Sequence, residues 1–134
     1  MKKLITAWFD GSITKNPGGR ASYGIIIKED GKEIFQETQV VGEGDKMSCN
    51  VAEYAGLFAI LDFILCNNLK NENITIIGDS QIVINTMNDW RKPFSKGLCL
   101  EISSACKSLN RKIQNINYKW VRREFNAECD AISK

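Results

Sequence analysis

The chain has 134 residues, of which 43% are hydrophobic and 25% are charged, and its formal net charge is +2. These values are ordinary for a soluble globular protein, and the length suits one domain with a sizeable core. The five cysteines form no C-x-x-C pair and the chain has no histidine, which excludes the usual ligand sets of a zinc site.

The first half of the chain predicts three antiparallel strands followed by a long helix. The strands are expected over Leu4–Asp10, Tyr23–Lys28 and Glu33–Val41. A loop over Ser12–Ser22 and a tight turn join them as a meander. Ser48 or Asn50 can N-cap the helix, which continues to about Asn67 and is apolar on several faces.

The second half predicts two more strands and three helices. A near-continuous apolar run over Ile74–Asp79 is typical of a parallel strand buried on both faces, and alternation predicts a strand over Ile116–Val121. The helices are expected from Ser80 to about Asp89, over Leu98–Lys112 and over Phe125–Lys134. The order β-β-β-α-β-α-α-β-α contains no linker or repeat, so we expect one α/β domain over residues 1–134.

Basic charge is concentrated in one part of the sequence. Residues 1–90 hold eight Lys/Arg and twelve Asp/Glu, whereas residues 91–123 hold nine Lys/Arg and one acid, Glu101. Such asymmetry suggests a surface that faces a polyanion, although a solvated helix face would give the same pattern.

The sequence predicts a cytoplasmic protein. The apolar start is too short for a signal peptide, and we expect no segment that crosses a membrane. The longest apolar segment, around Ala55 to Cys66, is interrupted by Asp62 and is typical of a buried helix. An odd number of widely spaced cysteines favours reduced thiols.

Two carboxylates follow apolar strands in similar contexts, Asp10 before Gly-Ser and Asp79 before Ser. A crossover through the long helix would place them side by side at the carboxyl ends of parallel strands. Glu53 lies near the start of that helix, and Asp130 lies in the last one. Three of these acids also have a structural interpretation: a turn cap for Asp10, a capping box Asn50-Val-Ala-Glu53 for Glu53, and surface charge for Asp130.

Eight short segments carry a recognisable pattern: Phe9-Asp10-Gly11-Ser12, Asn16-Pro17-Gly18, Tyr23-Gly24, Asn50-Val51-Ala52-Glu53, Asp79-Ser80-Gln81, Trp90, Trp120-Val121 and Asn126-Ala127-Glu128-Cys129-Asp130. In their order and approximate spacing, over nearly the whole chain, they resemble the type 1 ribonuclease H family. The resemblance implies a ribonuclease H-like fold with a mixed five-stranded sheet in the order 3-2-1-4-5. It also implies hydrolysis of the RNA strand of RNA–DNA hybrids, which would leave 5′-phosphate and 3′-hydroxyl ends.

By the same resemblance, the catalytic and metal-binding residues are Asp10, Glu53, Asp79 and Asp130. Oxygen ligands without histidine or thiolate favour two Mg²⁺ ions, with Mn²⁺ as a substitute, and Asp10 is the expected bridge. Without metal the crowded carboxylates repel, so at least one pKa should be raised. The residues expected to bind the RNA–DNA hybrid are Gly11, Ser12, Asn16, Ser48, Cys49, Asn50, Gln81, Trp90, Arg123 and Asn126.

The sequence departs from the family at several points. Cys49 replaces the usual polar residue, only seven residues (Arg91–Gly97) stand where longer members carry a basic protrusion, and the family's loop histidine is absent. The chain ends four residues after Asp130, so we expect a frayed final helix. These departures leave open a hybrid-binding or duplex-RNA-binding module without strong activity, and a domain derived from a reverse transcriptase. A monomer is expected, and no protein partner is implied.

Overall fold

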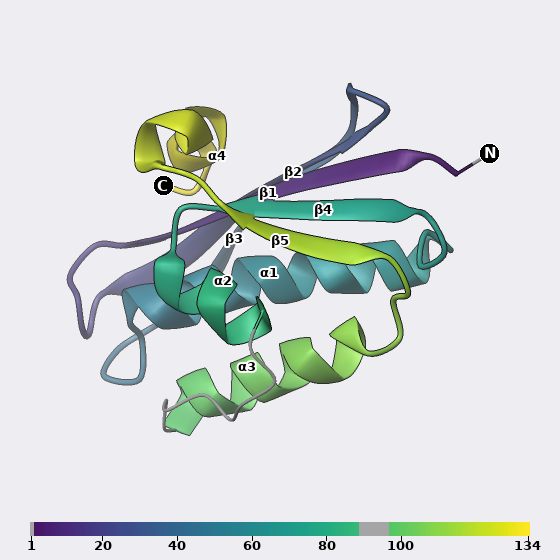
Figure 1. The fold of residues 1–134 in the computed structure, drawn as a ribbon. Coiled ribbons are helices and arrows are strands. Elements are labelled where there is room, and N and C mark those ends of the chain that lie inside the picture. Colours follow the sequence, from purple (N-terminus) through teal and green to yellow (C-terminus); the bar gives the residue numbers. More distant parts are fainter. Residues whose placement is uncertain (1, 89–96) are drawn as a thin grey trace.

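The structure is a computed structural model that describes residues 2–88 and 97–134. Five strands form one mixed sheet in the order β3-β2-β1-β4-β5, with helices on both faces (Figure 1). The strands are β1 Leu4–Ile13, β2 Arg20–Glu29, β3 Lys32–Glu43, β4 Asn73–Gly78 and β5 Ile116–Trp120. The helices are α1 Cys49–Cys66, α2 Gln81–Asn88, α3 Gly97–Asn110 and α4 Ala127–Ile132, and a short 3-10 helix η1, Arg123–Asn126, precedes α4.

The predicted fold class and strand order are confirmed. The pairs β1–β2 and β2–β3 are antiparallel, whereas β1–β4 and β4–β5 are parallel. The helix α1 crosses over from the meander to β4, so β1 and β4 run in the same direction and their carboxyl ends lie together.

The sequence predicted that β1 ends at Asp10, but the strand continues to Ile13. Its antiparallel pairing with β2 continues to Ile13 opposite Ala21, whereas its pairing with β4 stops at Trp8 opposite Ile77. The expected Gly-Ser turn is therefore wrong, because these residues stay in the ladder with β2. Beyond the last β1–β4 pair, one edge of β1 is open to side chains from other elements.

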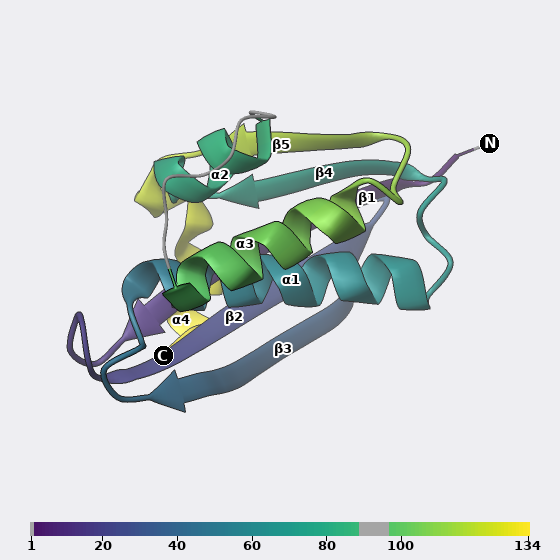
Figure 2. The same cartoon turned by 90° about the horizontal axis from the view of Figure 1, so that it is seen from below.

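The helix α1 is the centre of the core. It packs against the sheet face that carries Ile5, Ala7 and Phe9, and α3 packs on its other side (Figure 2). This double burial explains why α1 is apolar on several faces. Contrary to our expectation, its 18 residues are long and apolar enough to cross a membrane, but half of them are buried in the structure, as in a core helix.

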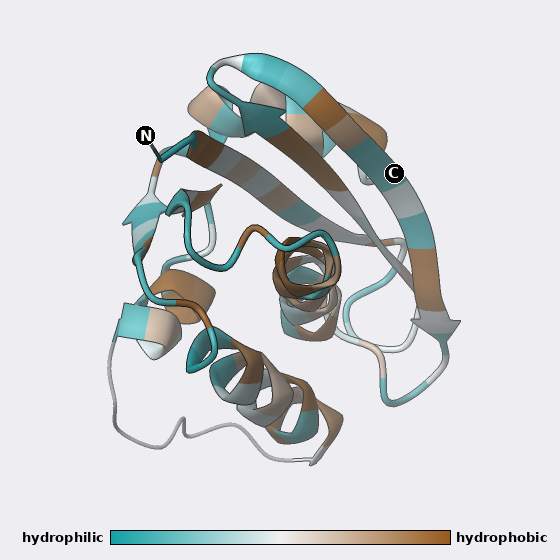
Figure 3. Ribbon diagram, turned by 90° about the vertical axis from the view of Figure 1, so that its right-hand side faces the viewer, coloured by the Kyte–Doolittle hydropathy of each residue, from teal (hydrophilic) through white to brown (hydrophobic). Residues whose placement is uncertain are grey.

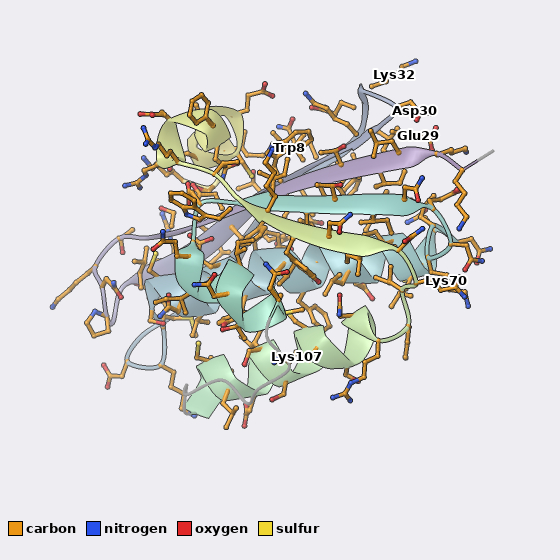
Figure 4. All side chains as sticks on the ribbon, viewed as in Figure 1. Trp8, Glu29, Asp30, Lys32, Lys70 and Lys107 are labelled. Atoms are coloured by element: carbon orange, nitrogen blue, oxygen red, sulfur yellow. The ribbon has the colours of Figure 1, made fainter. Side chains whose placement is uncertain are left out.

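The opposite face of the sheet receives η1 and α4. Gly24 makes this contact possible, because a Cβ there would lie 2.6 Å from Ile132 Cγ1 and 2.9 Å from the Ser133 backbone nitrogen. Trp8 points to the same face (Figure 4), and Lys28 Nζ lies 5.1 Å from the centre of its ring.

The last helix is shorter than predicted but it is well anchored. Thr38 Oγ1 donates a hydrogen bond to the Ile132 carbonyl at 2.7 Å, and Cys129 Sγ donates to the Gly24 carbonyl at 2.9 Å. Ser133 is fully buried and its carbonyl accepts from Ser22 Oγ. The expectation of a frayed final helix is therefore wrong, because β2 and β3 hold the end of the chain.

Candidate active site

Three carboxylates meet where β1 and β4 separate. Asp10, Glu53 and Asp79 each place an oxygen within 4.8 Å of the other two. Asp10 lies two residues beyond the last β1–β4 pair, and Asp79 directly follows β4, so the strand register brings these two together. Glu53 reaches the same point from α1, and only 2% of Asp10 and 5% of Glu53 is exposed to solvent.

Gly11 allows α1 to pack closely against β1. A Cβ at this position would lie 2.5 Å from the Glu53 backbone nitrogen and 2.8 Å from the Ala52 carbonyl carbon, so any side chain would push α1 away from β1. The Gly11 N–H also donates to Asp10 Oδ1 at 3.0 Å. Gly11 is buried, which argues against the substrate contact predicted for it.

The structural interpretation of Glu53 as part of a capping box is wrong. Ser48 is the N-cap of α1, and its hydroxyl accepts from the Val51 N–H at 3.2 Å. Glu53 therefore lies in the second turn, beyond the reach of a cap. The close packing of α1 at Gly11 places the Glu53 side chain beside Asp10 and Asp79.

Burial and mutual repulsion raise the pKa values of the three clustered acids. Desolvation is the main cause for Asp10, whose pKa rises to about 7, and contact with the Asp130 carboxyl and the charge of Asp79 raise it further. Desolvation also raises the pKa of Glu53 well above its usual range, reinforced by the charges of Asp10 and Asp79. The pKa of Asp79 is raised by desolvation and partly lowered by a hydrogen bond from Asn126. The predicted raised pKa is thus confirmed.

The cluster fits a hard cation. Among the described residues, Asp10 Oδ2 and Glu53 Oε2 are buried and have no hydrogen-bond donor. Buried carboxylate oxygens without a donor are costly unless a proton or a cation compensates them. Since the donor set is all oxygen, Mg²⁺, Ca²⁺ and Mn²⁺ match it better than softer metals.

Two side chains hold Asp79, although neither was predicted to do so. Asn126 Nδ2 donates to Asp79 Oδ2 at 3.4 Å and to the Phe9 carbonyl at 2.9 Å. Trp120 Nε1 donates to the Asp79 carbonyl at 2.9 Å. Asn126 is only 2% exposed, so its burial argues against the predicted substrate contact and makes it a positioning residue.

Asp130 lies beside the cluster but in a different environment. Its carboxylate contacts Asp10 and forms ion pairs with Arg123 Nη2 at 3.7 Å and Lys134 Nζ at 3.6 Å. The interaction with Asp10 and these two cations lower the pKa of Asp130. Lys134 was not among the predicted site residues, although its spacing of four residues from Asp130 is typical of a helical ion pair.

Most of the predicted substrate residues in the described part of the chain are at least partly exposed to solvent. The Cys49 N–H donates to Asn16 Oδ1 at 3.2 Å, which ties the loop after β1 to the start of α1. Burial and the charges of Glu53 and Asp10 raise the pKa of the Cys49 thiol. The remaining solvent-accessible candidates are Ser12 in β1, Ser48 and Asn50 at the start of α1, Gln81 at the start of α2, and Arg123 in η1. Trp90 and the basic stretch Arg91–Lys96 lie outside the described residues.

The basic residues of the second half do not share one surface. Lys107 lies on α3, on the side of the sheet that α1 covers (Figure 4). Lys119 pairs with Ile77 and so projects, like Trp8, from the opposite face. The single polyanion-facing surface inferred from the charge count is therefore split between two faces in the described part of the chain.

A mixed 3-2-1-4-5 sheet with acids grouped where β1 and β4 stop pairing is the arrangement of the ribonuclease H-like fold. A model of the family described as reverse transcriptase-like matches residues 8–134. The N-terminal ribonuclease H domain of a Mycobacterium tuberculosis protein, solved as a fusion with maltose-binding protein, is 27% identical, with a TM-score of 0.83 over 97% of this chain and 90% of that one. The chain therefore belongs to the reverse transcriptase-like group of the ribonuclease H family.

Two more distant structures share the fold. Ribonuclease H1 of the archaeon Halobacterium salinarum is 23% identical, with a TM-score of 0.79 over 97% of this chain and 94% of that one. The LC11 ribonuclease H1, isolated from compost by a metagenomic approach, was solved in complex with an RNA/DNA hybrid. That complex is 23% identical, with a TM-score of 0.82 over 96% of this chain and 92% of that one.

Proposed function

We propose that this protein is an endoribonuclease that hydrolyses the RNA strand of RNA–DNA hybrids and leaves 5′-phosphate and 3′-hydroxyl ends. The observation that carries the proposal is the cluster of Asp10, Glu53 and Asp79, whose carboxylate oxygens lie within 4.8 Å of one another. Membership of the ribonuclease H family and the hybrid bound to the LC11 enzyme support this choice of substrate.

The proposed cofactor is Mg²⁺, as two ions, with Mn²⁺ as a substitute. Asp10, Glu53 and Asp79 would hold the ions, and Asp130 would contribute from α4. When bound, the two ions would activate the attacking water and stabilise negative charge on the leaving 3′ oxygen. The two buried carboxylate oxygens without a donor support a cation at this place.

The protein itself orients the carboxylates. The Gly11 N–H holds one oxygen of Asp10, and the Asn126 amide holds one oxygen of Asp79. Because Asp10 has a pKa of about 7, a proton that it holds at neutral pH must leave before a cation takes its place. Arg123 and Lys134 keep Asp130 ionised beside this cluster.

Substrate contacts are proposed on the solvent side of the cluster. Asn16, the first turn of α1 and Gln81 would face the minor groove, where polar groups can test for the 2′-OH of the RNA strand. Lys and Arg side chains near the site would contact phosphates without reading sequence. Most of this binding energy would come from phosphate contacts, so affinity should fall steeply with salt.

A cleavage assay tests the proposal. Labelled RNA–DNA, RNA–RNA and DNA–DNA duplexes are incubated with the pure protein, with Mg²⁺, with Mn²⁺ and with EDTA. We expect cleavage of the RNA strand of the hybrid alone, dependent on the metal, with products that carry 5′-phosphates. Binding of the hybrid without cleavage in either metal would instead identify a binding module, and cleavage in EDTA would contradict the metal-dependent mechanism.

We further propose that the protein acts as a monomer in a reducing cytoplasm. None of the five cysteines, all of which lie in the described residues, forms a disulfide, and burial raises the pKa of the Cys106 thiol to about 12. A buried thiol that is this weakly acidic reacts slowly with oxidants. Thiol titration of protein prepared without reductant should find all five sulfhydryl groups after unfolding.

A further inference from the structure

We propose that the groove between β3, α1 and α3 binds an extended, basic segment of a partner protein, which adds to β3 as a sixth strand. The groove has a volume of about 460 Å³, and Tyr23, Val40, Phe58, Leu98, Glu101 and Ile102 contribute to its walls. We call it the β3–α3 groove. None of the four acids of the candidate active site lines it.

The groove is apolar and open to solvent. Phe58 on α1, which lines the groove, is 37% exposed. Of the described residues that line the groove, Tyr23, Gln39 and Glu101 carry polar side-chain groups. An exposed apolar groove with a polar rim is typical of a protein interaction site.

An extended segment fits this groove because β3 is an edge strand. Among the described strands β3 pairs only with β2, so one side of its backbone is left without a strand partner. Its pairing with β2 is irregular near both ends but regular from Phe35 to Gln39. A regular edge offers alternate N–H and C=O groups to an incoming strand.

Because the sheet is curved, a strand added to the edge of β3 would lie over the β3–α3 groove. Seen end-on, the sheet curves around α1, and β3 forms the rim that faces α3 across the groove (Figure 3). A strand paired to β3 would turn every second side chain towards Phe58 and Ile102. On binding, the backbone of the added strand would pair with β3 and its apolar side chains would be buried in the groove.

The charges around the groove select a basic partner. Glu101 lines the groove, Glu37 projects from β3 towards Tyr23, whose hydroxyl donates to it at 2.6 Å, and the exposed Asp62 lies one turn beyond Phe58 on α1. None of the described lining residues is basic. A peptide that alternates apolar and basic side chains would meet apolar walls and acidic edges together.

The same charges disfavour a second copy of this chain. Antiparallel pairing of β3 with β3 would bring the glutamates of two copies together, since β3 carries Glu33, Glu37 and Glu43 against Lys32. Like charges opposite one another on paired strands are destabilising. The occupant we propose is therefore a segment of a different protein.

The test measures binding of synthetic ten-residue peptides to the full chain. The probe alternates lysine and valine, and three controls alternate glutamate and valine, scramble the probe, or carry N-methyl groups on one backbone edge of the probe. Affinity is measured by fluorescence anisotropy at low and high salt. We expect the lysine–valine probe to bind at least about tenfold more tightly than each control, which corresponds to about 1.4 kcal/mol.

Variants locate the site. Phe58→Ala removes an exposed side chain from the groove and Glu101→Lys reverses its charge, so each should weaken binding of the probe at least about fivefold. Glu128→Lys, on the opposite face of the sheet, is the matched charge reversal and should not weaken binding beyond about twofold. Circular dichroism and thermal unfolding of each variant establish that it is folded.

Several results would overturn the proposal. Equal binding of the N-methylated peptide would exclude strand addition, and equal binding of the glutamate–valine peptide would exclude charge selection. Probe binding that Phe58→Ala and Glu101→Lys leave unchanged would place the site elsewhere. Dimerisation of the free chain that Phe58→Ala and Glu101→Lys abolish would show that a second copy occupies the groove. Hybrid cleavage is not a readout of any of these measurements, so the outcome is independent of the proposed function.

Discussion

The candidate active site contains two regions that hold carboxylates in different ways. Asp10 and Glu53 are buried by the packing of α1 on β1, with no cation beside them among the described residues, and their pKa values are raised. Asp130 lies on α4, nearer to solvent, where its interaction with Asp10 and then the charges of Lys134 and Arg123 lower its pKa. The first region is built to receive a cation, whereas the second already has its counter-charges.

The comparison shows two ways of holding a carboxylate, by buried packing and by exposed ion pairs. Burial can hold an acid in position only if something later compensates its charge. Exposed ion pairs hold an acid ionised at a low cost, but they fix its position weakly. We therefore expect large effects from changes in the buried region and small effects from changes around Asp130.

The largest effect is expected from Glu53→Gln. The substitution keeps the shape of the side chain but removes a buried charge from the proposed cation site, so cleavage of the hybrid should fall by about 10³-fold or more. Glu124→Gln, an exposed acid near the site, is the matched control and should retain cleavage within about threefold of wild type. A Glu53→Gln variant with near wild-type activity would remove Glu53 from the catalytic set.

The next effect concerns the stability of the metal-free protein. The pKa of Asp10 is about 7 in the folded protein against 3.8 for an unperturbed aspartate. Between these values the folded state holds a proton that the unfolded chain has released, so stability falls as pH rises from about 4 to about 7 and then levels off. Asp10→Asn removes this penalty and should stabilise the protein by roughly 2–4 kcal/mol at about pH 8 in EDTA.

Urea unfolding in EDTA across this pH range measures the effect. The difference between Asp10→Asn and wild type should shrink towards zero near pH 4, where Asp10 is protonated in both states. A difference that is independent of pH would mean that Asp10 does not carry the proton, and a destabilised variant at high pH would contradict the burial argument.

Gly11→Ala tests the contact that brings α1 to β1. The added Cβ would lie 2.5 Å from backbone, which cannot move aside as a flexible side chain can. We expect a loss of about 1–3 kcal/mol in the free energy of unfolding, and a fall in cleavage of roughly 10²-fold as Glu53 is displaced. Ser12→Ala, the next residue along the strand, is the control and should change stability little.

The smallest effect is expected from the double variant Arg123→Ala/Lys134→Ala. Both cations are largely exposed, with side chains 76% and 62% accessible, so their ion pairs with Asp130 are weak. The pKa of Asp130 should rise towards its ordinary value, while cleavage at neutral pH falls by less than about tenfold. A loss of cleavage as large as that expected for Glu53→Gln would contradict the proposed difference between the buried carboxylates and Asp130.

Much of the fold followed from hydrophobic patterning. The apolar run before Asp79 and the alternation over Ile116–Val121 predicted their strands because both patterns reflect burial directly. The boundaries at Gly11 and Ser12 were wrong, since Gly and Ser indicate a turn by local propensity but here remain paired with β2. Tertiary pairing overrides propensity at such positions, and the local sequence does not contain it.

The cluster was predictable in its members but not in its supports. Asp10 and Asp79 could be paired because each follows an apolar strand, and the parallel register then brings them together. The burial of Asn126 and its hydrogen bond to Asp79 join parts of the chain 47 residues apart, and no local pattern reports such a contact. The anchoring of α4 by β2 and β3 also depends on contacts between distant parts of the chain. Because Asp130 lies near the end of the sequence, we expected a frayed helix there instead.

The most direct test of the proposed activity is a cleavage time course of a labelled RNA–DNA hybrid with wild type and Asp10→Asn in Mg²⁺, with hybrid binding measured in parallel. We expect that wild type cuts the RNA strand, whereas the folded variant binds the hybrid and does not cut it. Cleavage by both proteins, or binding by both without cleavage by wild type, would contradict the assignment of Asp10 and its neighbours as a nuclease site.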